Sequence, residues 1–145
     1  MNRRSVLLEL AVRPLYLGML GAALWVLLRG HNDPGGGFIA GLIAVAATSA
    51  LAIVLGVARA RRWLPLAPMP LAAAGVALAL ASGLPALLFG EPYLTHQWGT
   101  LPLGEGGLKL STVLAFDLGV LAAVWGALAG YVLGLLAAGE EGTKA

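Results

Sequence analysis

Long apolar runs separated by short polar segments dominate this chain. The runs cover residues 12–28, 38–58, 70–89 and 110–138, and each holds at most one charged side chain. A helix needs about 20 apolar residues to cross the roughly 30 Å hydrocarbon core of a bilayer. The pattern therefore predicts an all-α integral membrane protein, with four transmembrane helices packed in a small bundle.

The composition agrees with this prediction. Of the 145 residues, 59% are hydrophobic and 11% are charged, and the mean hydropathy is +0.88. Soluble domains carry about 25% charged residues, so this balance excludes an ordinary soluble domain. Since the four spans use most of the chain, the loops are too short to build a second core. We expect residues 1–145 to form a single membrane domain in the lipid bilayer.

The basic residues report the topology of the spans. Seven of the nine lie on one side of the predicted membrane: Arg3, Arg4, Arg13, Arg59, Arg61, Arg62 and Lys144. Only Arg29 and Lys109 lie on the other side. Loops rich in Lys and Arg stay in the cytoplasm, so both termini are predicted to be cytoplasmic in a multi-pass protein. The net charge of +2 then needs no nucleic-acid partner.

Few residues are available for catalysis or for holding a metal. The chain has no Cys and only two His, which excludes a disulfide framework and leaves too few ligands for most metal sites. Residues 35–37 are all Gly, but the Lys-Ser/Thr that completes a phosphate-binding loop does not follow them. We expect no catalytic residue, no metal and no cofactor.

A polar turn links the first two spans, with the sequence His31-Asn32-Asp33-Pro34-Gly35-Gly36-Gly37-Phe38. Asn32 and Asp33 can accept backbone hydrogen bonds, Pro34 presets the turn, and the glycines allow φ values that other residues avoid. His31 titrates near neutral pH, and Asp33 offsets the positive end of the next helix. His31 and Asp33 are therefore ion-path candidates. The alternative is a tight turn that only lets two helices pack closely.

Asp117 lies about two turns inside the fourth span, at a depth of about 10 Å. An Asp at the centre of a membrane helix costs about 2.5–3.5 kcal/mol on insertion scales, so it should pair, become protonated or face water. It is a candidate for an ion path or for a structural hydrogen bond to another helix. Thr48, at mid-depth in the second span, is a weaker candidate because such hydroxyls often bond back to their own helix.

Several glycines have the spacing of helix-packing residues. Gly37 and Gly41 form a G-x-x-x-G pair, and the fourth span carries Gly119, Gly126, Gly130 and Gly134. Small residues at this spacing let helices approach closely in membranes. At 100° per residue, Asp117 lies about 180° from Gly126. One face of the fourth span is thus suited to packing, while the opposite face presents a carboxylate.

Three local features complete the prediction. Pro14 suits the first turn of the first span, with residues 5–12 as an interfacial helix or a cytoplasmic extension in which Glu9 pairs with Arg13. Gly83 and Pro85 predict a kink in the third span. Residues 90–109 are expected to form a polar loop, after which Ser111 or Thr112 caps the fourth span.

Two motifs resemble the B-type subunit of the Mrp-type multisubunit sodium/proton antiporters. The first is Gly30-His31-Asn32-Asp33-Pro34-Gly35-Gly36-Gly37-Phe38-Ile39-Ala40-Gly41-Leu42, and the second is Ser111-Thr112 followed by Phe116-Asp117-Leu118-Gly119-Val120. The resemblance covers essentially the whole chain. It maps the family's turn onto residues 31–38 and its intramembrane acid onto Asp117.

This resemblance implies a small subunit of a heteromeric complex in a prokaryotic cell membrane, where the proton gradient drives Na+ out of the cell. Related modules also occur in membrane-bound hydrogenase complexes and other redox complexes resembling complex I, so an equivalent structural role there is the alternative. Within an antiporter, the chain either lines the ion path through Asp117 and His31 or serves only as a structural adaptor. A self-sufficient transporter made of copies of this chain is the third hypothesis.

Overall fold

The computed structural model describes residues 3–29, 35–101 and 108–142. Its elements are α1 (Arg3–Leu28), α2 (Gly36–Leu55), α3 (Val57–Arg61), α4 (Pro68–Ala81), α5 (Leu84–Leu88), β1 (Trp98–Leu101), β2 (Leu108–Ser111) and α6 (Thr112–Gly142). Four described stretches are long and apolar enough to cross a membrane: Val6–Leu28, Gly36–Leu55, Pro68–Leu88 and Thr112–Glu140. The predicted four-helix membrane bundle is confirmed.

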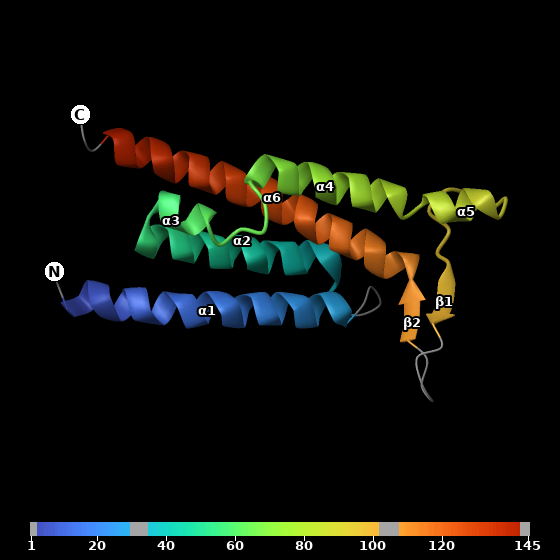
Figure 1. Ribbon diagram of the computed structural model, residues 1–145, viewed down its shortest axis with the longest axis horizontal. Helices are drawn as coiled ribbons and strands as arrows, with labels where there is room; N and C mark the ends of the chain where they lie inside the picture. Colours follow the sequence, from blue (N-terminus) through green and yellow to red (C-terminus); the bar gives the residue numbers. More distant parts are fainter. Residues whose placement is uncertain (1–2, 30–34, 102–107, 143–145) are drawn as a thin grey trace.

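The bundle is arranged around α6. Helix α4 packs along one side of α6, α2 packs along another, and α1 lies on the far side of α2 (Figure 1). Helix α1 begins and α6 ends at the same end of the bundle, where α3 also lies (Figure 1). An even number of spans has this consequence, because each span reverses the direction of the chain.

Helices α4 and α6 meet backbone to backbone. A Cβ atom added to Gly75 would collide with the backbone of Ala123, and one added to Gly126 would collide with the backbone of Ala72. Gly119 is equally close to α4, since a Cβ there would lie 2.8 Å from the carbonyl oxygen of Gly75. Such contacts favour association in lipid, where close van der Waals packing replaces the hydrophobic effect.

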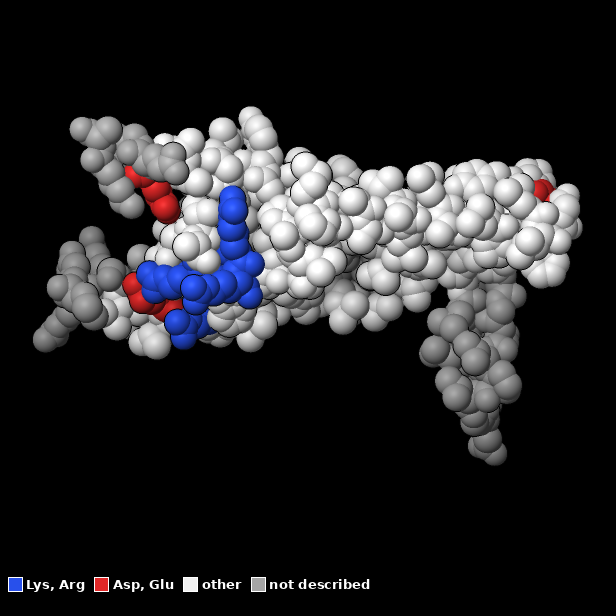
Figure 2. Space-filling model, turned by 45° about the horizontal axis from the view of Figure 1, so that its top comes forward, with Lys and Arg blue, Asp and Glu red and all other residues white. Residues whose placement is uncertain are grey.

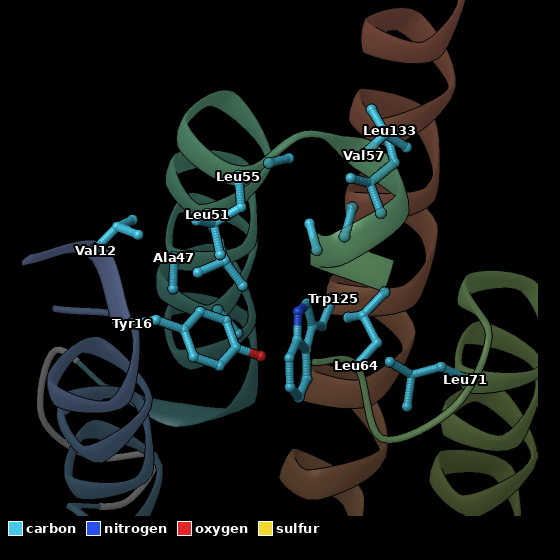
Figure 3. Packing of buried hydrophobic residues seen from close by; sticks show 14 residues of the cluster. Val12, Tyr16, Ala47, Leu51, Leu55, Val57, Leu64, Leu71, Trp125 and Leu133 are labelled. Carbon is cyan, nitrogen blue, oxygen red and sulfur yellow. The ribbon is translucent and has the colours of Figure 1, made fainter. Parts of the chain in front are cut away.

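The buried core lies between α1, α2, α3 and α6 (Figure 3). The Tyr16 hydroxyl donates a hydrogen bond of 2.9 Å to the carbonyl oxygen of Trp63, and the two rings meet edge to face at 5.5 Å. Trp63 belongs to the non-helical segment between α3 and α4, and Leu64 beside it is buried. The Leu64 side chain and the Trp63 carbonyl therefore anchor this segment to the core, while its other side chains are exposed.

The first span differs from the prediction. Helix α1 is continuous from Arg3, and Pro14 lies inside it, so the expectation that Pro14 opens the span is wrong. Of the two alternatives for residues 5–12, the extension of the first span is confirmed, because these residues belong to the same helix as the span. Val12 and Tyr16, on either side of Pro14, are both buried. Their packing offsets the hydrogen bond that proline removes from the helix.

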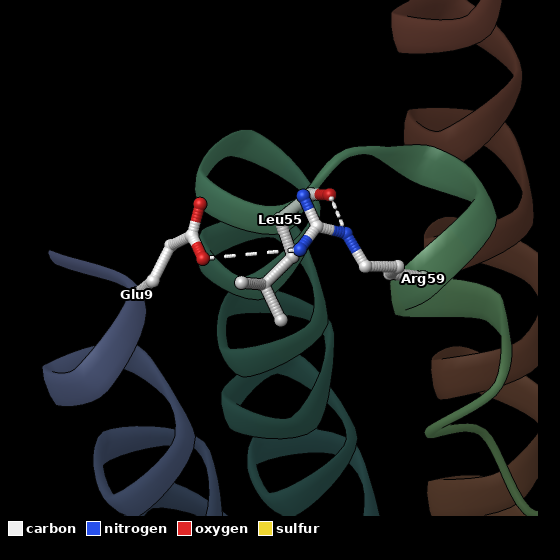
Figure 4. Close-up of polar contacts among 3 residues, drawn as sticks. All are labelled: Glu9, Leu55 and Arg59. Atoms are coloured by element: carbon white, nitrogen blue, oxygen red, sulfur yellow. Dashed lines mark hydrogen bonds and ion pairs between the residues drawn. The ribbon is translucent and has the colours of Figure 1, made fainter. Parts of the chain in front are cut away.

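Glu9 also has a different partner from the one predicted. Its carboxylate lies 3.9 Å from the Arg59 guanidinium, in an ion pair between α1 and α3 (Figure 4). The Nε of Arg59 donates a hydrogen bond of 2.7 Å to the carbonyl oxygen of Leu55, the last residue of α2. Arg59 thus caps the negative end of α2 while it holds α1.

The predicted kink in the third span is confirmed. Helix α4 ends at Ala81, and α5 begins at Leu84 after a two-residue turn. The Ser82 hydroxyl donates to the carbonyl oxygen of Ala79 (2.7 Å), and the Tyr93 hydroxyl donates to that of Leu80 (2.6 Å). These hydroxyls supply partners for carbonyls near the helix break, as membrane burial requires.

The expected polar loop contains a β-hairpin. Strands β1 and β2 pair antiparallel, with Trp98 opposite Ser111 and Leu101 opposite Leu108 (Figure 1). Ser111 follows directly into α6, where its hydroxyl accepts a long hydrogen bond of 3.4 Å from the Leu114 N–H. The predicted cap at Ser111 is confirmed, and the hairpin is an addition to the all-α prediction.

We expect Gly75→Ala to lower the free energy of unfolding by about 1–3 kcal/mol, because the added methyl group overpacks the α4–α6 contact. Gly134→Ala is the matched control. Nothing lies within 4 Å of a Cβ at Gly134, and alanine is the better helix former there by about 0.5–1 kcal/mol. Thermal unfolding of the full chain in detergent measures both changes. Equal melting temperatures for the two variants would contradict the contact.

Candidate functional site

Asp117 is the one buried acidic or basic side chain among the residues whose burial the structure describes, with 3% of its surface exposed. It lies in α6, where α2 crosses. A Cβ added to Gly37 would collide with the Asp117 carbonyl oxygen, and one added to Gly41 would lie 2.8 Å from the Val124 Cβ. The Asp117 face of α6 is therefore covered by α2, while Gly119 and Gly126 meet α4 on the opposite face.

Two adjacent glycines at the start of α2, Gly36 and Gly37, are required for different reasons. Gly36 has φ of +84°, a conformation that side chains disfavour, and Gly37 has no room for a Cβ. Gly35 precedes them in an extended conformation, with φ of −173°. Together they bring the first turn of α2 beside Asp117. The N–H groups of this turn carry partial positive charge, which favours a negative group nearby.

The structure describes only part of the turn motif of residues 31–38. His31, Asn32, Asp33 and Pro34 lie outside the described residues, so their relation to Asp117 stays a prediction. Phe38, the last residue of the motif, is exposed on the apolar surface of the bundle.

The buried Thr48 hydroxyl forms hydrogen bonds within the bundle. It is 1% exposed, its hydroxyl donates to the Ala44 carbonyl oxygen (2.9 Å), and it accepts a hydrogen bond from the Trp125 Nε1 (2.8 Å). Trp125 lies on α6, so this pair ties α2 to α6 at mid-depth. Sequence reasoning missed Trp125. Its signal was a Trp in mid-span, away from the interfacial belts where Trp is usual.

The segment before the hairpin fixes the start of α6. The Gln97 N–H donates to the Thr112 hydroxyl (3.0 Å), and the Thr112 N–H donates to the Gln97 carbonyl oxygen (3.1 Å). His96 lies next to this clasp and lines a hollow of about 210 Å³ together with Leu94, Val113 and Phe116. The clasp sets the position from which α6 carries Asp117 into the membrane.

The arrangement suits a proton or a shared cation better than a resident metal. No group of three or more His, Cys, Asp or Glu side chains gathers anywhere in the described ranges. A single carboxylate cannot complete the oxygen shell of a tightly held ion. It can bind and release a proton, or contribute one ligand to a path completed by other groups.

Known proteins resemble this chain in sequence and in fold. The family of domains related to the MnhB subunit of Na+/H+ antiporters matches residues 7–130, which include the α2–α6 crossing. The chain belongs to this family. The sequence resemblance to the B-type subunit of the Mrp-type antiporters is thereby confirmed.

Two bacterial relatives of this MnhB-related chain are of nearly the same length, and both are named as the B subunit of a Na+/H+ antiporter. The chain is 35% identical over 123 residues to the protein from Bacillus subtilis, covering 84% of this chain and 86% of the relative. It is 31% identical over 128 residues to the protein from Alkalihalophilus pseudofirmus, covering 87% and 88%.

Two longer proteins contain the same unit. A Rhizobium meliloti protein, named as the probable A/B subunit of a K+/H+ antiporter, is 37% identical over 134 residues, which are 88% of this chain and 12% of that protein. A chain in the solved Mrp complex of Dietzia matches with a TM-score of 0.77 and 30% identity, over 92% of this chain and 14% of that one. The MnhB-related unit thus occurs both alone and as a small part of a longer chain.

The two glycines at the start of α2 should respond differently to alanine. Gly36→Ala is expected to destabilise the protein by about 1–2 kcal/mol, since a left-handed φ brings Cβ against the backbone. Gly35→Ala carries no such penalty because its φ is extended. Thermal unfolding of the two variants compares them, and a Gly35 variant at least as unstable as the Gly36 variant would contradict this account.

Proposed function

We propose that this chain is the B-type membrane subunit of a multisubunit monovalent cation/proton antiporter in a prokaryotic cell membrane. In this role it works with the other subunits of the complex on Na+ and H+. The observation that carries the proposal is the buried Asp117 at the α2–α6 crossing, inside a family whose named members are antiporter subunits.

Asp117 borders the ion path in this proposal. Burying a carboxylate in a membrane helix is costly, and ionisable residues at such depth usually mark ion pathways or proton relays. The packing glycines do not support a purely adaptor role, because Gly119 and Gly126 are already used against α4 of the same chain. The described surface therefore leaves few glycines of that stripe for a partner subunit.

The proposed orientation places both termini in the cytoplasm. The end of the bundle where α1 begins and α6 ends also carries Arg59, Arg61 and Arg62, and Figure 2 shows basic side chains gathered there. The positive-inside bias assigns this end to the cytoplasm and the hairpin to the outer side.

Na+ is the proposed cation, because the relatives from Bacillus subtilis and Alkalihalophilus pseudofirmus are named Na+/H+ antiporter subunits. The Rhizobium meliloti relative is named for K+, so K+ belongs in the assay as the second cation. An equivalent role in a redox complex is the alternative, which predicts no cation-dependent proton movement in the absence of a redox substrate.

Asp117→Asn should reduce antiport on the order of 100-fold or more, the usual contribution of a group that transfers protons. The assay is Na+-dependent proton movement in everted vesicles containing the full set of partner subunits. Asn keeps the size of the side chain and can still form hydrogen bonds, but it cannot bind or release a proton. Equal assembly of the complex is verified by co-purification.

The matched control is Glu91→Gln, which removes an exposed carboxylate outside the spans. It should leave antiport unchanged. Full activity of an assembled Asp117→Asn complex would remove this chain from the ion path and leave it with a structural role.

A further inference from the structure

The third span begins later than its neighbours at the α3 end of the bundle. Helix α4 starts at Pro68, whose side chain contacts the position of Gly130 on α6. Helix α6 continues from Gly130 to Gly142, which adds about 18 Å at 1.5 Å per residue. Beside this last part of α6, α4 is absent (Figure 1).

The late start leaves the end of α6 without α4 beside it; this region, called the notch here, is defined by Gly130 and Gly134 of α6 and by Leu66 and Met69 at the start of α4. Nothing lies within 4 Å of a Cβ at Gly134. Met69 is 78% exposed and Leu66 is 50% exposed. In a bilayer such an apolar surface is covered, either by lipid or by another protein.

Two arginines precede the start of α4 in the chain: Arg61 is the last residue of α3, and Arg62 follows it. The Arg59 guanidinium contacts the Leu55 carbonyl oxygen and the Glu9 carboxylate. Arg61 and Arg62 are exposed, and their side chains have no hydrogen bond or ion pair among the described residues. Arg61 is two residues from Arg59, so it points to the opposite side of α3, away from α1 and α2. Figure 2 shows basic side chains reaching over the surface at this end of the molecule.

We infer that an anionic phospholipid occupies the notch. Its phosphate lies on Arg61 and Arg62, and an acyl chain runs along α6 past Gly134 toward Pro68. Two exposed guanidinium groups at one membrane surface favour a phosphate, which they can bind with paired hydrogen bonds. Trp63, partly exposed next to the arginines, suits the headgroup level.

The depth of the notch favours a lipid over a partner helix. A transmembrane helix needs a surface that continues through both leaflets, whereas Pro68 and α4 close the notch after about 18 Å at most. This depth is of the order of one leaflet of a 30 Å core. The inference does not rest on antiport, since it requires only that the chain is embedded in a membrane.

The test uses the purified complex in detergent, with binding of dioleoylphosphatidylglycerol and dioleoylphosphatidylcholine measured by native mass spectrometry. We expect the double variant Arg61→Gln/Arg62→Gln to weaken phosphatidylglycerol binding about 30-fold, with little effect on phosphatidylcholine. Arg61→Lys/Arg62→Lys should restore most of the binding because it restores the charge.

Two matched controls separate the notch from general effects. Arg13→Gln/Arg29→Gln removes the same charge elsewhere and should leave binding unchanged. Gly134→Leu fills the notch and should weaken binding, whereas Gly18→Leu, at an equally open glycine on α1, should not.

Three lipid-binding results would overturn the inference: equal losses in both double-glutamine variants, equal binding of the two lipids, or no loss in Gly134→Leu. Dissociation of a partner protein from Arg61→Gln/Arg62→Gln, whatever lipid is present, would assign these arginines to an acidic segment of that partner and would also overturn it.

Discussion

The fold depends on backbone contact between α6 and its two neighbours. Inside a bilayer, helices gain no hydrophobic energy by leaving the lipid, so they associate through close packing and hydrogen bonds. Here α4 meets α6 at Gly75, Gly119 and Gly126, and α2 meets it at Gly37. The absence of a Cβ at each of these positions lets the helices approach to backbone contact.

The burial of Asp117 follows from the same constraint. The side chain lies on the α2 face of α6, and that face is closed because Gly37 lets the backbone of α2 reach the Asp117 carbonyl. A larger residue at either crossing would open the route to lipid on one side. The same stretch of α6 therefore serves both packing and chemistry. Its glycine face packs against α4, and its opposite face presents the Asp117 carboxylate toward α2.

Most of the correct predictions from the sequence came from short-range patterns of hydrophobic and polar residues. The four spans and the opposite faces of Asp117 and Gly126 follow from hydropathy and the helical period, and the structure places α2 and α4 on those faces. Contacts between distant residues were beyond such patterns. Glu9 pairs with Arg59 and not with its neighbour Arg13, and Trp125 bonds to Thr48, 77 residues away.

Pro14 and the hairpin were missed for two further physical reasons. Proline disfavours a helix interior by about 3 kcal/mol, but burial of Val12 and Tyr16 outweighs that local preference. The strands of the hairpin are only four residues each, too short for alternation to distinguish them from a loop. In both cases tertiary packing decided what local sequence left open.

The segment between α3 and α4 shows how the bundle tolerates irregular backbone. Buried non-helical peptide groups need hydrogen-bond partners from the protein when neither water nor lipid supplies them. The Trp63 carbonyl receives the Tyr16 hydroxyl from α1, and Leu64 fills the core below it. Tyr16 thus allows the chain to leave α3 and enter α4 part-way along α6. This hydrogen bond and the packing of Leu64 hold the connecting segment in place just before the third span begins.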